Sequence, residues 1–200
     1  MTSVTPSDGE GTRTTDALVE HLVARIHGVP FKVVYVFSGA GSQALAWLLA
    51  VAGASRTLLE ATVPYAQSSM IDLLGDEPAD YVSAETALAM AAAAEKRAFM
   101  LAEGGSPVLG LACTATIATD REKRGDHRCA VAVSGRGSGE WAYTLTLAKG
   151  RRDRAGEEDV VSRLVLRTFA QACGVDDGAA GLPLGLLDGE VVEVVQAHSS

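Results

Sequence analysis

One stretch decides the fold of this chain: residues 31–42, with the sequence FKVVYVFSGAGS. Its first seven residues are mostly β-branched or aromatic, which is typical of a strand buried in the middle of a sheet. Small residues from Ser38 to Ser42 end this strand, and an apolar segment with the length of a helix follows over 42–51. A strand, a glycine turn and a helix in this order form the repeating unit of an α/β sheet.

The same pattern recurs further along the chain. A second strand is expected to end at Pro64 and a third near Cys113, while Ser83 is a favourable N-cap for the longest helix. The turn 135–139 separates two more strands, which we expect to pair as an antiparallel hairpin. The expected strands are 31–37, 57–63, 107–113, 129–133 and 140–148, and the expected helices are 16–27, 42–51, 67–74, 84–102 and 159–173. Residues 190–196 fit a short strand or a helix equally well.

These elements predict an α/β protein, a three-layer α/β/α sandwich around a mixed sheet of about five strands. The length of 200 residues suits one domain, which we place at 15–175. Residues 1–14 are rich in Ser, Thr, Gly and Pro and are expected to be disordered. Residues 176–200 are expected to form a glycine-rich, acidic tail.

Composition excludes several classes of partner. The net charge of −8 provides no cationic field, so we expect neither nucleic-acid binding nor attachment to a membrane surface. No apolar run reaches about 20 residues, the length that spans a bilayer. The N-terminus lacks a basic region followed by an apolar run, which predicts a cytoplasmic protein. The three cysteines contain no CxxC pair, which indicates reduced thiols and no metal site.

The glycine turn that follows the first strand has two interpretations. A tight turn between a strand and a helix needs glycine for steric reasons alone, here at Gly39 and Gly41. Alternatively, the backbone N–H groups at the start of the helix bind a phosphate. The turn has neither the lysine of a Walker A loop nor the GxGxxG spacing of a dinucleotide site, so the residues leave both interpretations open.

The order and spacing of several short motifs resemble the carboxy-terminal domain of the CinA family, whose members include nicotinamide-nucleotide amidases. The family has a Ser-Cys-Thr-Gly-Gly segment after its first strand and a serine seventeen residues further on, which is the separation of Ser38 and Ser55 here. Tyr65 falls on the family's Tyr-Ser-Asn segment, and the sequence VSAE at 82–85 is similar to its Val-Ser-Glu helix start. The resemblance covers residues 31–173 and implies the same three-layer fold.

The resemblance also implies a reaction. Family members hydrolyse the linear amide of nicotinamide mononucleotide to nicotinic acid mononucleotide and ammonia, with no cofactor. A serine attacks the amide carbon, and backbone N–H groups hold the oxyanion. Carried over to this chain, Ser55 is the nucleophile, and Ser38 and Tyr65 support it by hydrogen bonding. The substrate-binding residues that we expect are Gly39, Gly41, Ser42, Thr114, Thr116 and His127.

The chain departs from the family at one catalytic position. The family has a lysine a few residues after the tyrosine, and counting without a gap places Met70 there. Methionine cannot take a proton from a serine hydroxyl, and residues 61–75 contain no Lys, Arg or His. His127, in the loop KRGDHR at 123–128, is the candidate replacement base if this loop faces the site rather than the solvent. This loop is similar to that of a eukaryotic-type branch of the family, in which the domain precedes a nicotinate-nucleotide adenylyltransferase-like domain.

Three functions are open at this point. The first is a weak nicotinamide-nucleotide amidase that acts through Ser55. The second is a catalytically silent pyridine-nucleotide-binding module, or a partner of an adenylyltransferase, and Met70 favours it over the first. The third is a scaffold without a ligand, which would need no hydroxyl groups at Ser38, Ser55 and Tyr65. We expect these three hydroxyl groups to meet in one cleft at the strand ends, a nucleotide to be the ligand, and the protein to be a homo-oligomer.

Overall fold

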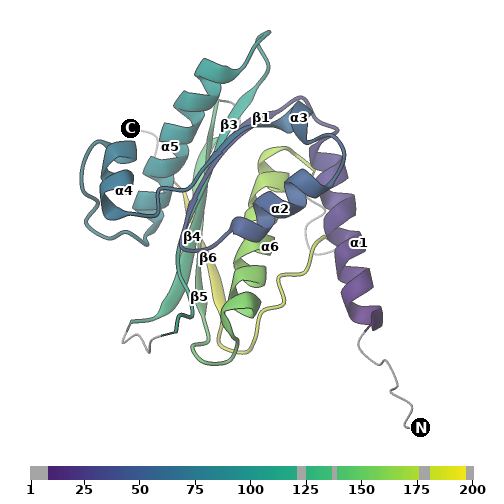
Figure 1. The fold of residues 1–200 in the computed structure, drawn as a ribbon, viewed down its shortest axis with the longest axis vertical. Coiled ribbons are helices and arrows are strands. Elements are labelled where there is room, and N and C mark those ends of the chain that lie inside the picture. Colours follow the sequence, from purple (N-terminus) through teal and green to yellow (C-terminus); the bar gives the residue numbers. More distant parts are fainter. Residues whose placement is uncertain (1–8, 121–124, 137–138, 176–180, 197–200) are drawn as a thin grey trace.

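A computed structural model of the chain shows a mixed six-stranded sheet with helices packed on both of its faces (Figure 1). The structure describes residues 9–120, 125–136, 139–175 and 181–196. The strands are β1 (Lys32–Ser38), β2 (Leu58–Thr62), β3 (Val108–Thr116), β4 (His127–Gly135), β5 (Gly139–Leu147) and β6 (Val191–Gln196). The helices are α1 (Gly9–Ile26), α2 (Ser42–Ala50), α3 (Ala54–Thr57), α4 (Gln67–Leu74), α5 (Ala84–Leu101) and α6 (Arg154–Ala172).

The strands follow the order β2-β1-β3-β4-β5-β6 across the sheet. β1 pairs in parallel with β2 and β3, whereas β4, β5 and β6 continue the sheet by antiparallel pairing. The expected α/β fold with a mixed sheet is confirmed, with six strands rather than about five. The sixth is β6, whose residues fitted a strand and a helix equally well. It forms a strand because the outer edge of β5 offers partners for its backbone N–H and C=O groups.

The two ends of the chain differ in detail from the expected boundaries. Helix α1 begins at Gly9, and residues 1–8 lie outside the described residues. Leu182 and Leu184, in the expected tail, are buried in the core, and β6 belongs to the sheet. The segments 176–180 and 197–200 lie outside the described residues. Among the helices that are described, none is both long enough and apolar enough to cross a bilayer.

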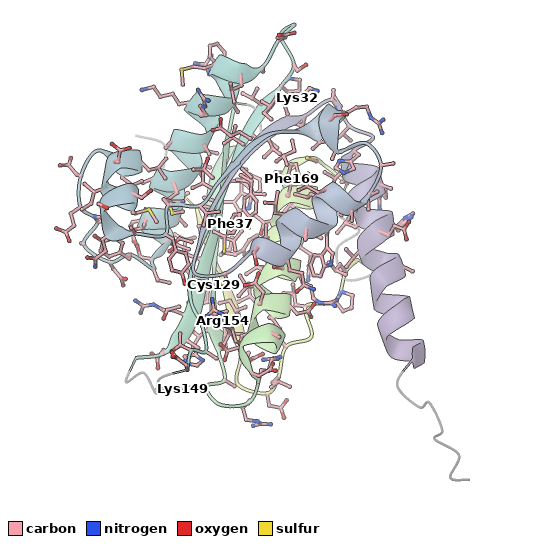
Figure 2. The ribbon with its side chains drawn as sticks, in the orientation of Figure 1. Lys32, Phe37, Cys129, Lys149, Arg154 and Phe169 are labelled. Atoms are coloured by element: carbon pink, nitrogen blue, oxygen red, sulfur yellow. The ribbon has the colours of Figure 1, made fainter. Side chains whose placement is uncertain are left out.

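The side chains of β1 enter two separate apolar cores, because successive residues of a strand point to opposite faces. Tyr35 and Phe37 belong to the core formed with α1, α2 and α6, in which Phe169 is also buried (Figure 2). Val34 and Val36 belong to the core formed with α4 and α5. Ser38 continues this second set and lies on the α4 and α5 side of the sheet.

Helix α5 lies close to β3 because both contribute small residues. A Cβ atom at Gly110 of β3 would lie 1.9 Å from the carbonyl oxygen of Ala91. The buried face of α5 is largely alanine, at Ala84, Ala87, Ala91, Ala94 and Ala98. This close packing places the segment 80–83, which leads into α5, beside the end of β3.

Candidate ligand-binding site

A cavity of about 190 Å³ lies where the parallel strands β1 and β3 end, beside α4. The carboxyl ends of parallel strands are the usual location of ligand sites in α/β sheets. The residues that line the cavity are Ser38, Pro64, Tyr65, Ala66, Gln67, Met70, Tyr81, Val82, Thr114 and Ala115. Ser38, Tyr65 and Thr114 were expected site residues, and the structure brings these three to one place.

Ser38 and Thr114 reach the cavity because β1 and β3 are in register. The two residues are partners at the ends of neighbouring strands, and both lie on the face that carries α4 and α5. The Thr114 hydroxyl is buried and donates a hydrogen bond to the carbonyl oxygen of Tyr81 at 2.6 Å. This bond attaches the segment before α5 to the sheet and closes one side of the cavity.

The wall formed by residues 80–83 is held by several further hydrogen bonds. One carboxylate oxygen of Asp80 accepts the backbone N–H of Val82 at 2.9 Å, and the other accepts the guanidinium of Arg128 at 2.6 Å. The Ser83 hydroxyl accepts the N–H of Thr86 at 3.1 Å and caps α5, as its sequence predicts. The wall therefore has a defined position relative to β3, β4 and α5.

The lining of the cavity contains polar groups but no general base. Four hydroxyl groups, one amide and one thioether line it, and none of the lining residues is a carboxylate, amine or imidazole. Met70 is only 2% exposed and packs in the core beneath the cavity. Tyr65 is 70% exposed and lies at the rim. Partial burial and the Glu77 carboxylate, which accepts the Tyr81 hydroxyl at 3.2 Å, raise the pKa of Tyr81, so that this hydroxyl stays protonated.

The expectation that Ser55 joins Ser38 and Tyr65 in one cleft is wrong. Ser55 is exposed on the short helix α3, which leads directly into the start of β2. β2 runs parallel to β1, so Ser55 lies at the edge where these strands begin, and Lys32 at the start of β1 donates to the carbonyl oxygen of Arg56 at 2.6 Å. Ser38 lies at the other end of β1. The seven residues of this strand separate its two ends by about 20 Å.

The turn at residues 39–43 holds a carboxylate of the protein itself. Glu158 of α6 accepts the N–H of Gly41 at 3.0 Å, the N–H of Gln43 at 3.0 Å and the hydroxyl of Ser42 at 2.9 Å. The backbone donors that we expected to be free for a phosphate are therefore already bonded. Gly39 has a steric role, because a Cβ atom there would lie 1.9 Å from the carbonyl oxygen of Ala115.

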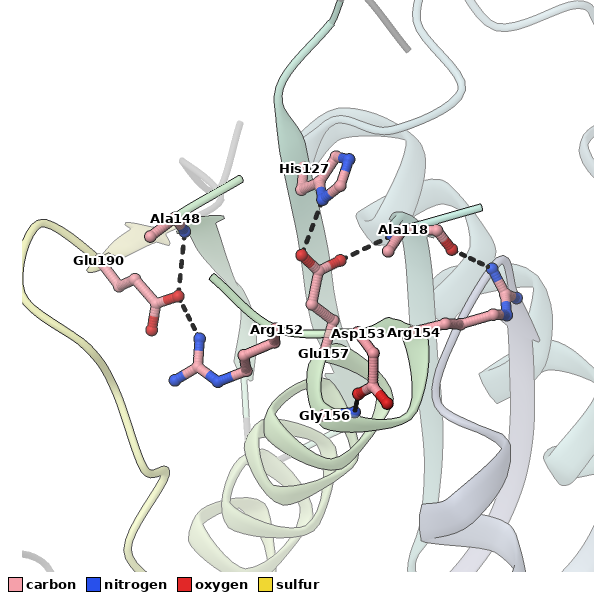
Figure 3. Close-up of polar contacts among 9 residues, drawn as sticks. All are labelled: Ala118, His127, Ala148, Arg152, Asp153, Arg154, Gly156, Glu157 and Glu190. Carbon is pink, nitrogen blue, oxygen red and sulfur yellow. Dashed lines mark hydrogen bonds and ion pairs between the residues drawn. The ribbon is translucent and has the colours of Figure 1, made fainter. Parts of the chain in front are cut away.

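His127 lies on the opposite face of the sheet from the cavity, so it is not the replacement base of this site. Its Nδ1 atom is 2.7 Å from a carboxylate oxygen of Glu157, and the other oxygen accepts the N–H of Ala118 at 2.7 Å (Figure 3). Both His127 and Glu157 are buried. Glu157 therefore connects α6 to His127 of β4 and to the loop after β3.

Arg128, the last residue of the segment KRGDHR, faces the cavity side instead. It follows His127 in β4, and strand alternation alone places the two side chains on opposite faces. Arg128 is paired with Thr116 in the sheet, and its guanidinium reaches Asp80 beside the cavity wall. Thr116 does not line the cavity, because it lies one strand repeat beyond Thr114.

Arg154, which is not among the expected site residues, connects two loops at this edge of the sheet. It donates to the carbonyl oxygen of Ala118 at 2.9 Å (Figure 3). It also donates to the carbonyl oxygen of Gly39 at 3.1 Å. Asp153 caps α6 through the N–H of Gly156 at 2.8 Å. The two contacts of Arg154 hold the loops after β1 and β3 in place, and no local sequence pattern predicts them.

Neither a metal-binding cluster nor an exposed thiol is present among the described residues. No three His, Cys, Asp or Glu side chains within the described ranges gather to hold a metal ion. The cysteines Cys113, Cys129 and Cys173 are free and buried. Burial raises the pKa of Cys129 and of Cys173 to about 12 and that of Cys113 well above its ordinary value, so the three thiols stay protonated.

Taken together, the sheet order and the cavity define a three-layer α/β/α domain with a small cavity, of about 190 Å³, at the ends of its parallel strands. No protein-family model matches the sequence, and no curated protein matches it either. The fold does match solved structures: it is similar to the fold of several CinA competence/damage-inducible proteins, at 17–18% sequence identity.

Three of these structures illustrate the likeness. The competence/damage inducible protein CihA from Agrobacterium tumefaciens is 18% identical, and the alignment covers 87% of this chain and 99% of that one, with a TM-score of 0.59. A CinA superfamily protein from Escherichia coli is 17% identical over 84% and 94% of the two chains, with a TM-score of 0.61. One from Enterobacter cloacae is 17% identical over 87% and 97%, with a TM-score of 0.58. At these identities the comparison shows a common fold.

Proposed function

We propose that this chain is a CinA-like binding domain whose cavity holds the nicotinamide ring of a pyridine nucleotide, and that it hydrolyses the carboxamide slowly at most. One observation carries the proposal: the cavity at the strand ends is lined by hydroxyl, amide and thioether groups, with no side chain that can act as a base. Such a lining binds a polar ring but does not activate a nucleophile.

The cavity is large enough for only the ring of the nucleotide. A volume of about 190 Å³ is below the roughly 300–1,000 Å³ of pockets that enclose a whole drug-sized ligand. It suits one substituted aromatic ring, with the ribose and phosphate outside. Tyr65 and Tyr81 contribute aromatic faces and Met70 a polarizable sulfur, which are favourable neighbours for a pyridinium ring.

The hydrogen-bonding groups suit a carboxamide better than a carboxylate. Ser38 provides a hydroxyl that donates or accepts, and Gln67 provides both an acceptor and donors. No cation is among the lining residues to neutralise a carboxylate. We therefore expect nicotinamide mononucleotide to bind more tightly than nicotinic acid mononucleotide.

Two groups that the implied amidase reaction requires, the nucleophile and the general base, are absent from the residues that line this cavity. Ser55, the implied nucleophile, lies at the opposite edge of the sheet, and Met70 stands where the family has lysine. Ser38 is a hydroxyl in the cavity, but loss of a general base slows such reactions by about 10²–10⁴-fold. This supports binding over turnover.

The proposal is tested by titrating the purified protein with nicotinamide mononucleotide and nicotinic acid mononucleotide while ammonia is measured. Nicotinamide mononucleotide should bind and release little ammonia. At 100 times its Kd it should add about 2.7 kcal/mol to the free energy of unfolding, which is seen as a higher Tm. Ser38→Ala should weaken binding, whereas Ser55→Ala, at an exposed position away from the cavity, should not. Fast ammonia release that Ser55→Ala abolishes would overturn the proposal, as would the absence of binding by either nucleotide.

A further inference from the structure

A mononucleotide whose ring lies in the cavity carries a phosphate outside it, and that phosphate needs a cationic partner. None of the lining residues is positively charged. The glycine turn at 39–43 does not supply the partner, because Glu158 occupies its donors. The inference below rests on the proposed function and concerns the group that binds the phosphate.

Arg128 is a cation on the correct face and at the correct end of the sheet. Its sheet partner Thr116 lies two residues beyond Thr114, and side chains two residues apart on one strand share a face. Its guanidinium reaches Asp80, the residue that directly precedes Tyr81 and Val82 in the cavity wall. The positive charge therefore lies beside the cavity wall, and Arg128 itself is not a lining residue.

The Arg128–Asp80 ion pair is accessible and can be exchanged. The two side chains are 43% and 49% exposed, and ion pairs at such positions contribute little to stability. The guanidinium has five N–H donors, and its contact with Asp80 is through a single terminal nitrogen at 2.6 Å. Its Nε is buried and has no acceptor among the described residues.

We propose that Arg128 binds the phosphate monoester of the nucleotide whose ring occupies the cavity, and that Asp80 holds the guanidinium in position while the site is empty. A phosphate has more negative charge and more acceptor oxygens than one carboxylate, and it matches the planar guanidinium with two parallel hydrogen bonds. Asp80 keeps its bond to the N–H of Val82 when Arg128 turns to the ligand, so the cavity wall stays in place.

The test compares nicotinamide mononucleotide with nicotinamide riboside, which has the same ring and no phosphate. Arg128→Gln should weaken binding of the mononucleotide about 10-fold to 100-fold, the value of a charge-assisted hydrogen bond, and leave the riboside unchanged. Asp80→Asn removes the competing charge but keeps an acceptor for Val82, so it should strengthen mononucleotide binding. Inorganic phosphate should compete with the mononucleotide and not with the riboside.

The matched control is Arg97→Gln. Arg97 forms an ion pair of similar exposure with Glu60, at 2.7 Å, away from the lining residues. It should change the affinity of neither ligand.

Three results would overturn the inference, and each has a separate meaning. Equal loss of both ligands in Arg128→Gln would show that Arg128 only supports the wall. A wild-type protein that binds the riboside as tightly as the mononucleotide has no phosphate site, although the proposed ring binding would stand. Failure of both ligands to bind the wild type would remove the proposed function as well.

Discussion

Glu158 of α6 accepts the backbone N–H of Gly41, a residue 117 positions earlier in the chain, at 3.0 Å. The same carboxylate accepts the N–H of Gln43 and the hydroxyl of Ser42. The start of a helix carries a partial positive charge and unpaired N–H groups, and here a side chain of the protein satisfies both. The glycine turn thus joins α2 to α6, and the cavity lies on the other face of the sheet.

Replacing Glu158 tests this internal anion. We expect Glu158→Ala to lower the free energy of unfolding by about 1–2 kcal/mol, because three donors at the start of α2 lose their acceptor. Inorganic phosphate should then raise the Tm of the variant more than that of the wild type. Urea unfolding and a phosphate titration of Tm give the two measurements.

Glu193→Ala is the control for that variant, since Glu193 is exposed on β6. It should leave stability and the response to phosphate near those of the wild type. A Glu158→Ala protein as stable as the wild type would show that water replaces the carboxylate at no cost.

Met70→Lys should increase the release of ammonia from nicotinamide mononucleotide, by up to about 100-fold over the wild type, because it supplies a base at the cavity. The position is 2% exposed, and burial disfavours a charged lysine, which keeps the amine neutral and basic near pH 7. We expect lower thermal stability and a lower affinity, because the thioether that lines the cavity is lost. Ammonia release and calorimetric binding measure the two effects.

Double variants identify the nucleophile that such a lysine would activate. With Ser38 in the cavity, adding Ser38→Ala to Met70→Lys should remove the gain, while adding Ser55→Ala should preserve it. The opposite pattern would restore Ser55 as the nucleophile and require α3 to move.

Thr114→Val keeps the shape of the side chain and removes its hydroxyl. The carbonyl oxygen of Tyr81 then loses the 2.6 Å hydrogen bond from Thr114, which should cost about 1–2 kcal/mol of stability. Urea unfolding should show this loss, and amide exchange at Tyr81 and Val82 should become faster. Thr146→Val, at an exposed position of β5, is the control and should lose far less.

His27 should make stability depend on pH. Burial lowers the pKa of His27 below its ordinary value of 6.5, the nearby Arg56 adds to this, and the bond to the carbonyl oxygen of Leu48 partly opposes it. The unfolded chain therefore binds more protons between the lowered pKa and 6.5. The contribution of His27 is complete above pH 6.5 and is lost as the pH falls toward the lowered value, about 1.4 kcal/mol for each unit of the shift.

Denaturant unfolding at pH 7.5 and at pH 5 measures this dependence. His27→Gln should reduce the difference between the two values, and His21→Gln, at an exposed position, should not. An unchanged difference in His27→Gln would assign the dependence to other groups.

The fold could be predicted from the sequence because the features that indicate its helices and strands lie within short segments of the chain. The alternation of β1 sends Val34 and Val36 to one core and Tyr35 and Phe37 to the other, and the glycine turn and the Ser83 cap mark helix starts. The same alternation also separates His127 from Arg128, so the sequence contained the signal that identifies Arg128.

Ser55 shows where a motif misleads. Its separation from Ser38 matches that of the family's two serines. In the structure, however, Ser55 lies on α3, which leads into the start of β2, whereas Ser38 lies at the carboxyl end of β1. The number of residues between two positions does not determine at which edge of the sheet each of them lies.

The sequence by itself determined the α/β class and most helices and strands, and it placed Ser38 at the end of the first strand. Propensity, periodicity and caps act between residues that are close in the chain. Only the tertiary structure decided that Glu158 fills the glycine turn, that Glu157 holds His127, and that Asp80 holds Arg128 at the cavity. These contacts join residues 30 to 117 positions apart, and they depend on how α6 and the segment before α5 pack on the sheet.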